Sequence, residues 1–463
     1  MFSKGNHKRI GLIEKTTLIG RIRRKKMKKY LKLFTATLMA LVMLLGVTAC
    51  GNGNGDTPGG GKGESKIVEV MFHVDEKSKE GIAYKKRVNA FNQEYNDEGI
   101  KISASYIART AGASDYEQKL IGMQNTGDLP DIITFDAPNC ASYAASDLLW
   151  DITKLVSKET KDDFISLNEY NGKLYGLPIQ ESSAGFYYNK ALFNQAGINV
   201  SGYTVENPWT FAQFKEVCAK LKGINVTPVD MRLSSTDEMS TYLLYPLIYA
   251  AGGSFVSEDG YTANGYFNST ATQKGFQFIK DLVNAGYTGY AVNDTAFFDG
   301  QVGMYLSSGW TIPDLDSGNY VKFQGRDSWG LLPYPKDAAS ASATGSWSYG
   351  VTNNGRKDKT NVMLALEWLV SVESSKVVTG ATGMIPARKS VETSYADSDP
   401  QMVLMKQLSL TGRERPVTVG YPQFSTNFRQ VLNDMKNADL STVLATRTTT
   451  LQKELDDLKK IHG

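Results

Sequence analysis

Short strands alternate with amphipathic helices in the region that follows a glycine-rich stretch. Residues 67–72, 100–107 and 129–135 are rich in β-branched and other apolar residues, as strands are. Between them, residues 84–95 repeat apolar side chains every three or four positions, and residues 116–123 also read as helix. This order is typical of a parallel α/β sheet, in which ligands bind beyond the carboxyl ends of the strands. The polar residues at those ends are His73, Asp75 and Asp136.

The same alternation starts again farther along the chain. We expect strands at 184–188, 226–231 and 302–307 and helices at 211–221, 242–251 and 272–285. A last helical stripe contains Leu440, Val443, Leu444, Leu451, Leu455 and Leu458. No repeat of about 20–50 residues is visible, which argues against a solenoid. Since 463 residues are enough for two or three domains, we predict two α/β lobes.

The charge of the chain is unevenly distributed. The whole chain carries 51 Lys and Arg and 48 Asp and Glu, a formal charge of +3. Residues 1–49 hold 12 of the basic residues and one acidic residue, which leaves 39 against 47, a charge of −8, for the rest. Nucleic-acid binding needs clustered basic residues that release counterions. We therefore predict a partner other than nucleic acid.

Histidine is scarce, and this narrows the chemistry that the chain can perform. The three histidines are His7, His73 and His462. A zinc site built from several imidazoles is therefore nearly excluded, and a Ser-His-Asp triad would have to use His73. Glycoside hydrolysis by two carboxylic acids needs no histidine, so it stays as the enzymatic alternative.

The N-terminal region has the features of a secretory signal. Residues 27–32 are basic, residues 33–47 form an apolar run too short to span a bilayer comfortably, and small residues precede Cys50. We interpret residues 1–49 as a signal peptide in which 1–26 are an upstream extension before Met27. Residues 50–65 are rich in glycine, which is typical of a flexible tether.

The sequence Val47-Thr48-Ala49-Cys50 resembles the lipobox of bacterial lipoproteins. The resemblance implies that Cys50 is lipidated and becomes the mature N-terminus, which anchors the protein to the membrane without spanning it. Only Cys140 and Cys218 follow, too few for a disulfide framework, and because we place them in different lobes we predict free thiols.

Several short strings follow one another along the chain. They are Gly172–Pro178, Phe186–Lys190, Phe193 with Ala196–Ile198, Pro208–Phe211, Phe297–Met304, Ser308–Trp310, Leu332–Pro335, Leu364–Leu369 and Gly383–Arg388. This succession resembles that of the extracellular solute-binding proteins of ABC importers, the group that includes maltose-binding protein. Each string is weak alone, but in this order they are strong, and the resemblance extends over nearly all of residues 66–462.

This resemblance implies a two-lobed α/β fold with three crossovers and a central ligand cleft. One lobe would contain residues 66–182 and 334–378, and the other residues 183–333 and 379–463. It further implies a monomer that is not an enzyme and needs no cofactor or metal. Such a protein binds a carbohydrate, most simply an oligosaccharide, by hinge closure. It delivers this ligand to an ABC importer from the outer face of the cytoplasmic membrane.

A carbohydrate presents hydroxyl groups and an apolar ring face, so its site needs carboxylates or amides together with aromatic rings. Trp310 is the first choice for an aromatic plate, because Ser308-Gly309 before it leaves room for a ligand, and Trp347 is the second. The polar candidates are Asp136 and Glu181, although this crossover acid is offset by one position from its place in maltose-binding protein. Further candidates are Tyr187, Tyr242 and His73; Arg388 reads instead as a salt-bridge residue between the lobes.

Three alternatives remain open from the sequence. Asp136 and Glu181 could form the acid pair of a carbohydrate-active enzyme. The same fold could serve as the ligand sensor of a membrane signalling system. A ligand other than a carbohydrate, such as a polyamine or an iron complex, is the third.

Overall fold

The computed structural model describes residues 66–109, 115–233, 237–345, 347–393, 395–396 and 399–463. The predicted signal peptide, Cys50 and the glycine-rich tether lie outside these residues. The described residues belong to one compact unit that is assigned to Gly61–Gly463.

A six-stranded sheet contains the first three predicted strands. Its order is β2 (Lys101–Tyr106), β1 (Ile67–Phe72), β3 (Ile132–Asp136), β12 (Trp347–Val351), β5 (Lys173–Pro178) and β4 (Asn168–Tyr170). The strands β2, β1 and β3 are parallel, as predicted, whereas β12 runs antiparallel to both of its neighbours. The third strand begins at Ile132 rather than at 129, since Pro130 has no N–H to donate to a ladder.

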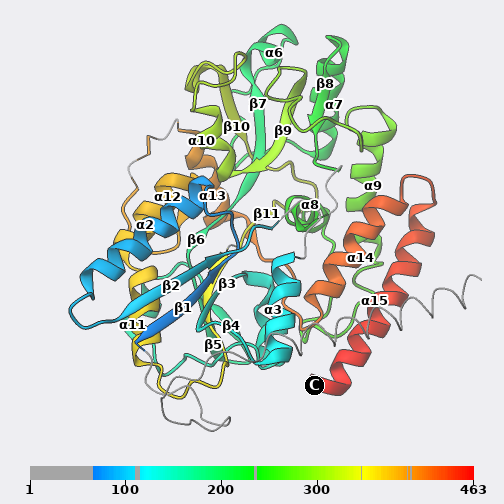
Figure 1. Cartoon of the computed structure of the whole chain (residues 1–463). Coiled ribbons are helices and arrows are strands. Elements are labelled where there is room, and N and C mark those ends of the chain that lie inside the picture. The colour runs from blue at the N-terminus through cyan, green and yellow to red at the C-terminus, as the bar shows by residue number, and fades with distance from the viewer. Residues whose placement is uncertain (1–65, 110–114, 234–236, 346, 394, 397–398) are drawn as a thin grey trace, which may run out of the picture. The chain divides into compact units, whose positions relative to one another are not determined.

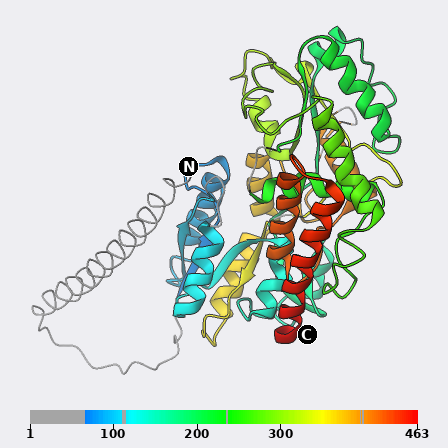
Figure 2. The ribbon, with the colours of Figure 1, turned by 90° about the vertical axis from the view of Figure 1, so that its right-hand side faces the viewer.

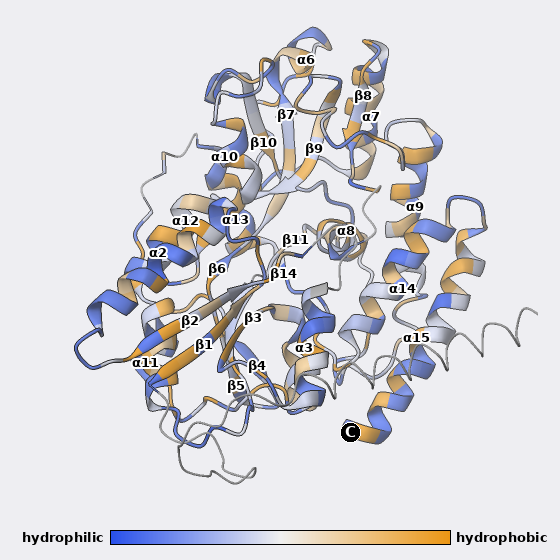
Figure 3. Ribbon diagram, in the orientation of Figure 1, coloured by the Kyte–Doolittle hydropathy of each residue, from blue (hydrophilic) through white to orange (hydrophobic). Residues whose placement is uncertain are grey.

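Helices cover both faces of this sheet, and successive side chains of a strand point to opposite faces. Val70 and Phe72 pack in the core under α2 (Lys79–Glu94), α11 (Thr360–Leu369) and α12 (Val372–Thr382), which lie together on one side (Figure 1). Met71 between them packs in the core formed with α3 (Asp115–Thr126) and α4 (Cys140–Ala145). All residues of β3 and residues Val70 to Phe72 of β1 are buried, and their nearly continuous apolar sequence follows from burial on both faces (Figure 3).

A second, four-stranded sheet has the order β10 (Trp329–Leu332), β7 (Ala184–Asn189), β9 (Val302–Ser308) and β8 (Thr227–Asp230). Only β8 and β9 pair in parallel. The helix predicted at 242–251 begins four residues earlier, at Glu238, because the Asp237 side chain accepts a hydrogen bond from the backbone N–H of Met239 and caps it. The other elements of this region are α6 (Lys190–Gln195), α7 (Phe211–Gly223), α8 (Glu238–Ala250), α9 (Thr270–Asn284), η2 (Gly309–Thr311), α10 (Ile312–Leu315) and η3 (Arg326–Ser328).

The C-terminal helices α14 (Tyr421–Asp434) and α15 (Leu440–His462) run side by side and complete the core around α8 (Figure 2). Five of the six residues of the predicted stripe of α15 are buried, namely Leu440, Val443, Leu444, Leu451 and Leu455, and the sixth, Leu458, is partly buried. Among the described residues, no helix is both long and apolar enough to cross a membrane.

The chain passes between the two sheets three times. The first and third passes pair with each other, through β6 (Gln180–Glu181) and β13 (Ile385–Pro386). The second pass leads from β10 to β12, and its residues Tyr334 and Ala343 pack in the core around α8. The predicted lobe boundaries stay a prediction. The remaining elements are η1 (Ala137–Asn139), α5 (Lys158–Asp162), β11 (Ser342–Ala343), α13 (Pro400–Leu410) and β14 (Gly412–Arg413).

Two further sequence predictions concern side chains outside the cleft. Cys140 and Cys218 are buried free cysteines. Arg388 forms a salt bridge in which its Nε donates to Asp163 Oδ2 at 2.7 Å, whereas its place between the lobes stays a prediction.

Candidate functional site

A cavity of about 650 Å³ lies at the carboxyl ends of β1 and β3. His73, Asp75 and Asp136, the residues expected at these strand ends, all line it. Elements of the second sheet and of the C-terminal region supply the facing residues, and they include Trp310, Tyr242 and Arg415. The cavity is therefore shared between the two sheets and brings together residues that are far apart in the sequence.

The floor on the side of the six-stranded sheet is aromatic. Trp347 opens β12 directly opposite Asp136 in the antiparallel register with β3. The His73 ring stacks on Trp347, with ring centroids 3.3 Å apart, and its Nδ1 is 3.0 Å from Thr134 Oγ1. Burial lowers the pKa of His73 well below its usual range, so this imidazole is neutral at physiological pH. The Arg109 guanidinium lies over the same indole, 5.0 Å from its centroid.

The opposite side carries a second aromatic pair. Trp310 lies in η2, immediately after β9, and its ring centroid is 5.9 Å from that of Tyr242 on α8. The Tyr242 hydroxyl donates to Ser182 Oγ at 2.7 Å, which ties α8 to the first pass between the sheets. Trp310 is half-buried and lines the cavity, so part of its ring is available to a ligand.

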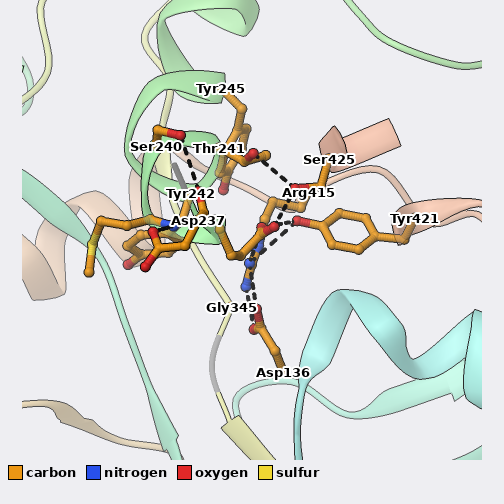
Figure 4. Close-up of polar contacts among 12 residues, drawn as sticks. Asp136, Asp237, Ser240, Thr241, Tyr242, Tyr245, Gly345, Arg415, Tyr421 and Ser425 are labelled. Atoms are coloured by element: carbon orange, nitrogen blue, oxygen red, sulfur yellow. Dashed lines mark hydrogen bonds and ion pairs between the residues drawn. The ribbon is translucent and has the colours of Figure 1, made fainter. Parts of the chain in front are cut away.

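Asp136 is held by an arginine that the sequence did not indicate (Figure 4). Arg415 donates from Nη2 to Asp136 Oδ1 at 2.6 Å and from Nη1 to Oδ2 at 2.8 Å, a bidentate pair. Nη1 also donates to Glu238 Oε1 at 2.9 Å, and this carboxylate accepts from Tyr421 and Ser425. Burial alone would lower the pKa of Arg415, but Asp136, with Tyr421 and Glu238, holds it well above its usual range. The negative charge of Asp136 is thus compensated by Arg415, and the two hydrogen bonds fix the position of its carboxylate.

A second ion pair bridges the cavity at its rim. Lys79 on α2 donates to Asp314 on α10 at 2.7 Å. Both side chains are about half exposed, so this pair contributes little to stability. The described residues contain no group of three His, Cys, Asp or Glu that could hold a metal ion.

Five of the predicted ligand residues therefore line one cavity: His73, Asp136, Tyr242, Trp310 and Trp347. Two do not. Tyr187 is fully buried in the core of the second sheet, where its hydroxyl donates to the Ser308 carbonyl at 2.7 Å. Glu181 lines a different, smaller cavity, because its neighbours Gln180 and Ser182 face the larger one and side chains alternate along an extended segment.

Gly309 allows a close approach, but of the backbone rather than of a ligand. A Cβ built on Gly309 would lie 2.5 Å from the carbonyl oxygen of Gly383, which ends α12 with φ +72°. We expect Gly309→Ala to lower the free energy of unfolding by about 1–3 kcal/mol, as overpacking does. Urea denaturation would measure this. Gly122→Ala in α3, whose Cβ would meet no atom of the described residues within 4 Å, serves as the control and should be neutral or stabilising.

Comparison with known proteins agrees with this architecture. The family model described as bacterial extracellular solute-binding protein matches residues 86–403. A Brucella abortus protein named only as a binding protein is 26% identical over 57% of this chain and 63% of its own length. The carbohydrate ABC transporter substrate-binding protein of Streptococcus pneumoniae is 25% identical over 63% of this chain and 60% of its own length. The matches thus span less than two thirds of these relatives.

A solved structure shares the two-lobed α/β fold. The ABC transporter solute-binding protein of Thermotoga lettingae, solved with bound α-D-tagatose, superposes with a TM-score of 0.70. It covers 84% of this chain and 100% of its own, at 19% sequence identity. The predicted fold class is confirmed.

Proposed function

Because the chain belongs to the bacterial extracellular solute-binding proteins, we propose that it binds a carbohydrate, most simply an oligosaccharide, and delivers it unaltered to a membrane ABC importer. The proposal for the ligand rests on one observation: indoles from opposite sides, Trp347 and Trp310, line the same cavity. An apolar ring face that buries about 60 Å² on one indole gains about 1.5 kcal/mol.

The polar groups of the cavity suit a neutral guest rich in hydroxyl groups. The carboxylates of Asp136 and Glu238 are compensated by Arg415, and that of Asp314 by Lys79. A carboxylate held in this way still has lone pairs that can accept a hydrogen bond from a sugar hydroxyl. A sugar whose hydroxyl is misplaced cannot make this hydrogen bond, so it binds more weakly. Gln180 adds a side-chain amide, which can both donate and accept hydrogen bonds.

The mechanism is closure of the two lobes rather than chemistry. The residues that line the cavity come from both sheets, so a ligand that contacts both favours the closed arrangement. The paired β6 and β13 belong to two of the three passes, where backbone rotation would be absorbed while the lobes stay rigid. Asp136 and Glu181 line separate cavities, which does not favour the acid pair of a glycosidase. We expect a monomer without enzymatic activity.

The proposed membrane attachment lies at the N-terminus, outside the described residues. Removal of residues 1–49 and lipidation of Cys50 would leave residues 51–65 as a tether. One acyl chain holds a protein only transiently at about 0.8 kcal/mol per buried CH₂, whereas two or more chains hold it stably. The protein would then work at the outer face of the cytoplasmic membrane.

Thermal unfolding against a panel of neutral mono- and oligosaccharides tests the proposal. A sugar present at about 100 times its dissociation constant should raise the free energy of unfolding by about 2.7 kcal/mol. Chromatography of the recovered sugar after hours of incubation should show it unchanged. Release of shorter products would favour an enzyme, and a panel without any stabilising sugar would contradict carbohydrate binding.

A further inference from the structure

A second cavity, of about 260 Å³, lies on the other side of the strands that border the larger one. Strand alternation separates the two: Trp347 faces the larger cavity and Ser348 the smaller. Glu181 on β6 faces the smaller cavity for the same reason. Arg415 and Gly345 line both cavities and form part of the partition between them.

Two polar atoms in this smaller cavity are buried without a partner in the part of the chain that the structure describes. Ser348 is fully buried, Asn168 is 9% exposed, and neither Ser348 Oγ nor Asn168 Oδ1 has a hydrogen-bond partner among these residues. Glu181 is 2% exposed, and its Oε1 accepts a hydrogen bond from Ser166. Buried polar groups are rarely left unsatisfied in proteins, because each costs about 1–3 kcal/mol. A bound guest would supply the missing partners.

The charges around the cavity favour a cation. The buried carboxyl group of Glu181 and the carboxylates of the exposed residues Glu169 and Glu414 line it, and its one lining cation among the described residues, Arg415, is engaged with Asp136 and Glu238. Burial raises the pKa of Glu181 to about 7, with a further contribution from Glu414. Of the other titratable groups that face the cavity, the Cys140 thiol stays neutral, since burial raises its pKa to about 12.

The rest of the wall is aliphatic. The side chains that give this character are Ile165, Leu167, Leu408 and Val417, with Pro138 and Pro178. The lining of the cavity thus combines oxygen acceptors with an apolar surface. At about 30 Å³ per water molecule, it has room for about nine waters or for a short alkyl chain with a polar head.

We propose that this second cavity binds a small primary alkylammonium compound, whose ammonium group donates to Glu181 while its alkyl part packs on the aliphatic wall, with the oxygen atoms of Asn168 and Ser348 as the other acceptors that line the cavity. An ammonium group has three N–H donors and no acceptor, which matches unpaired oxygen atoms. The site is distinct from the carbohydrate cleft, so it can be occupied whether or not that cleft holds a sugar.

Binding should depend on pH in a defined direction. An ammonium group favours the charged form of Glu181, so it binds the deprotonated carboxylate and releases a proton. Since the pKa of Glu181 is about 7, the fraction deprotonated rises about tenfold between pH 6 and pH 8. The association constant should rise by about the same factor and level off above pH 8.

Isothermal titration of the whole chain with propylammonium chloride, with 1-propanol as the uncharged probe of the same shape, tests this proposal. We expect one propylammonium site, the pH dependence above, and at least tenfold weaker binding of 1-propanol. Glu181→Gln should weaken propylammonium binding tenfold or more at pH 8 and abolish its pH dependence. Ser348→Ala should weaken it without removing the pH dependence.

Asp230→Asn is the matched control, because Asp230 is another buried carboxyl whose pKa burial raises, but it lies on β8 and outside the cavity. Its propylammonium affinity should equal that of the parent. Three results would overturn the proposal: no propylammonium binding at any pH, equal binding of 1-propanol, or binding unchanged in Glu181→Gln. A parent chain that binds calcium but no amine would also overturn the proposal. If Glu181→Gln then loses the calcium binding, the cavity is a metal site.

Discussion

Replacing Arg415 by methionine is expected to lower the free energy of unfolding by about 3–5 kcal/mol. Arg415 is 5% exposed, and its guanidinium group bonds the carboxylates of Asp136 and Glu238 at once. Its removal leaves the buried carboxylate of Asp136 and the partly buried carboxylate of Glu238 without their hydrogen-bonded cation, and this costs more than the pairs contribute when intact. Urea denaturation at neutral pH, with the slope of the transition checked for two-state behaviour, measures the loss.

Two variants separate this explanation from a simple loss of packing. Adding Asp136→Asn and Glu238→Gln to Arg415→Met removes the uncompensated charges and should recover most of the lost stability. Lys79→Met removes the exposed pair with Asp314 and should change stability by less than about 1 kcal/mol. A triple variant no more stable than Arg415→Met would show that charge compensation is not the role of Arg415.

Trp310→Ala is expected to weaken oligosaccharide binding tenfold or more while the chain stays folded. The indole is half-buried beside Tyr242 and lines the cavity. Loss of its contact with a sugar ring face removes about 1.5 kcal/mol, which corresponds to somewhat more than tenfold in the dissociation constant. Titration with the best sugar of the panel gives the affinity, and circular dichroism verifies the fold.

Trp368→Ala is the matched control for this prediction. Trp368 is also half-buried, but it lies on α11, where its Nε1 donates to the Arg87 carbonyl, and it does not line the cavity. Its affinity for the sugar should equal that of the parent. Equal affinity in Trp310→Ala and the parent would remove Trp310 from the site.

Local patterns in the sequence predicted much of the fold and the position of the cleft. The apolar periods of residues 67–135 located β1, α2, β2, α3 and β3, and the ends of two parallel strands pointed to His73 and Asp136. Trp310 could be placed because it follows β9 directly. In each case the signal lies within a few neighbouring residues, where backbone periodicity and strand ends are encoded.

Glu181 shows where local patterns fail. This acid is displaced by one position relative to the crossover acid of maltose-binding protein. A shift of one residue in an extended segment turns a side chain to the opposite face. Glu181 therefore lines the smaller cavity while Gln180 and Ser182 line the larger. Tyr187 fails for a related reason, since every residue of β7 is buried and no alternation distinguishes a cleft face from a core face.

Four features of this protein can be read from the sequence alone: the periodicity, the strand ends, the uneven charge and the N-terminal signal. Each of them depends on residues that are close together in the sequence. The partner of Asp136 cannot be read in this way, because Arg415 is 279 residues away and its string Arg413-Glu414-Arg415-Pro416 resembles any charged loop. Which carboxylates are compensated, and how one crossover separates two cavities, depend on contacts between distant segments. Those contacts exist only once the sheets have packed and water has left the groups between them.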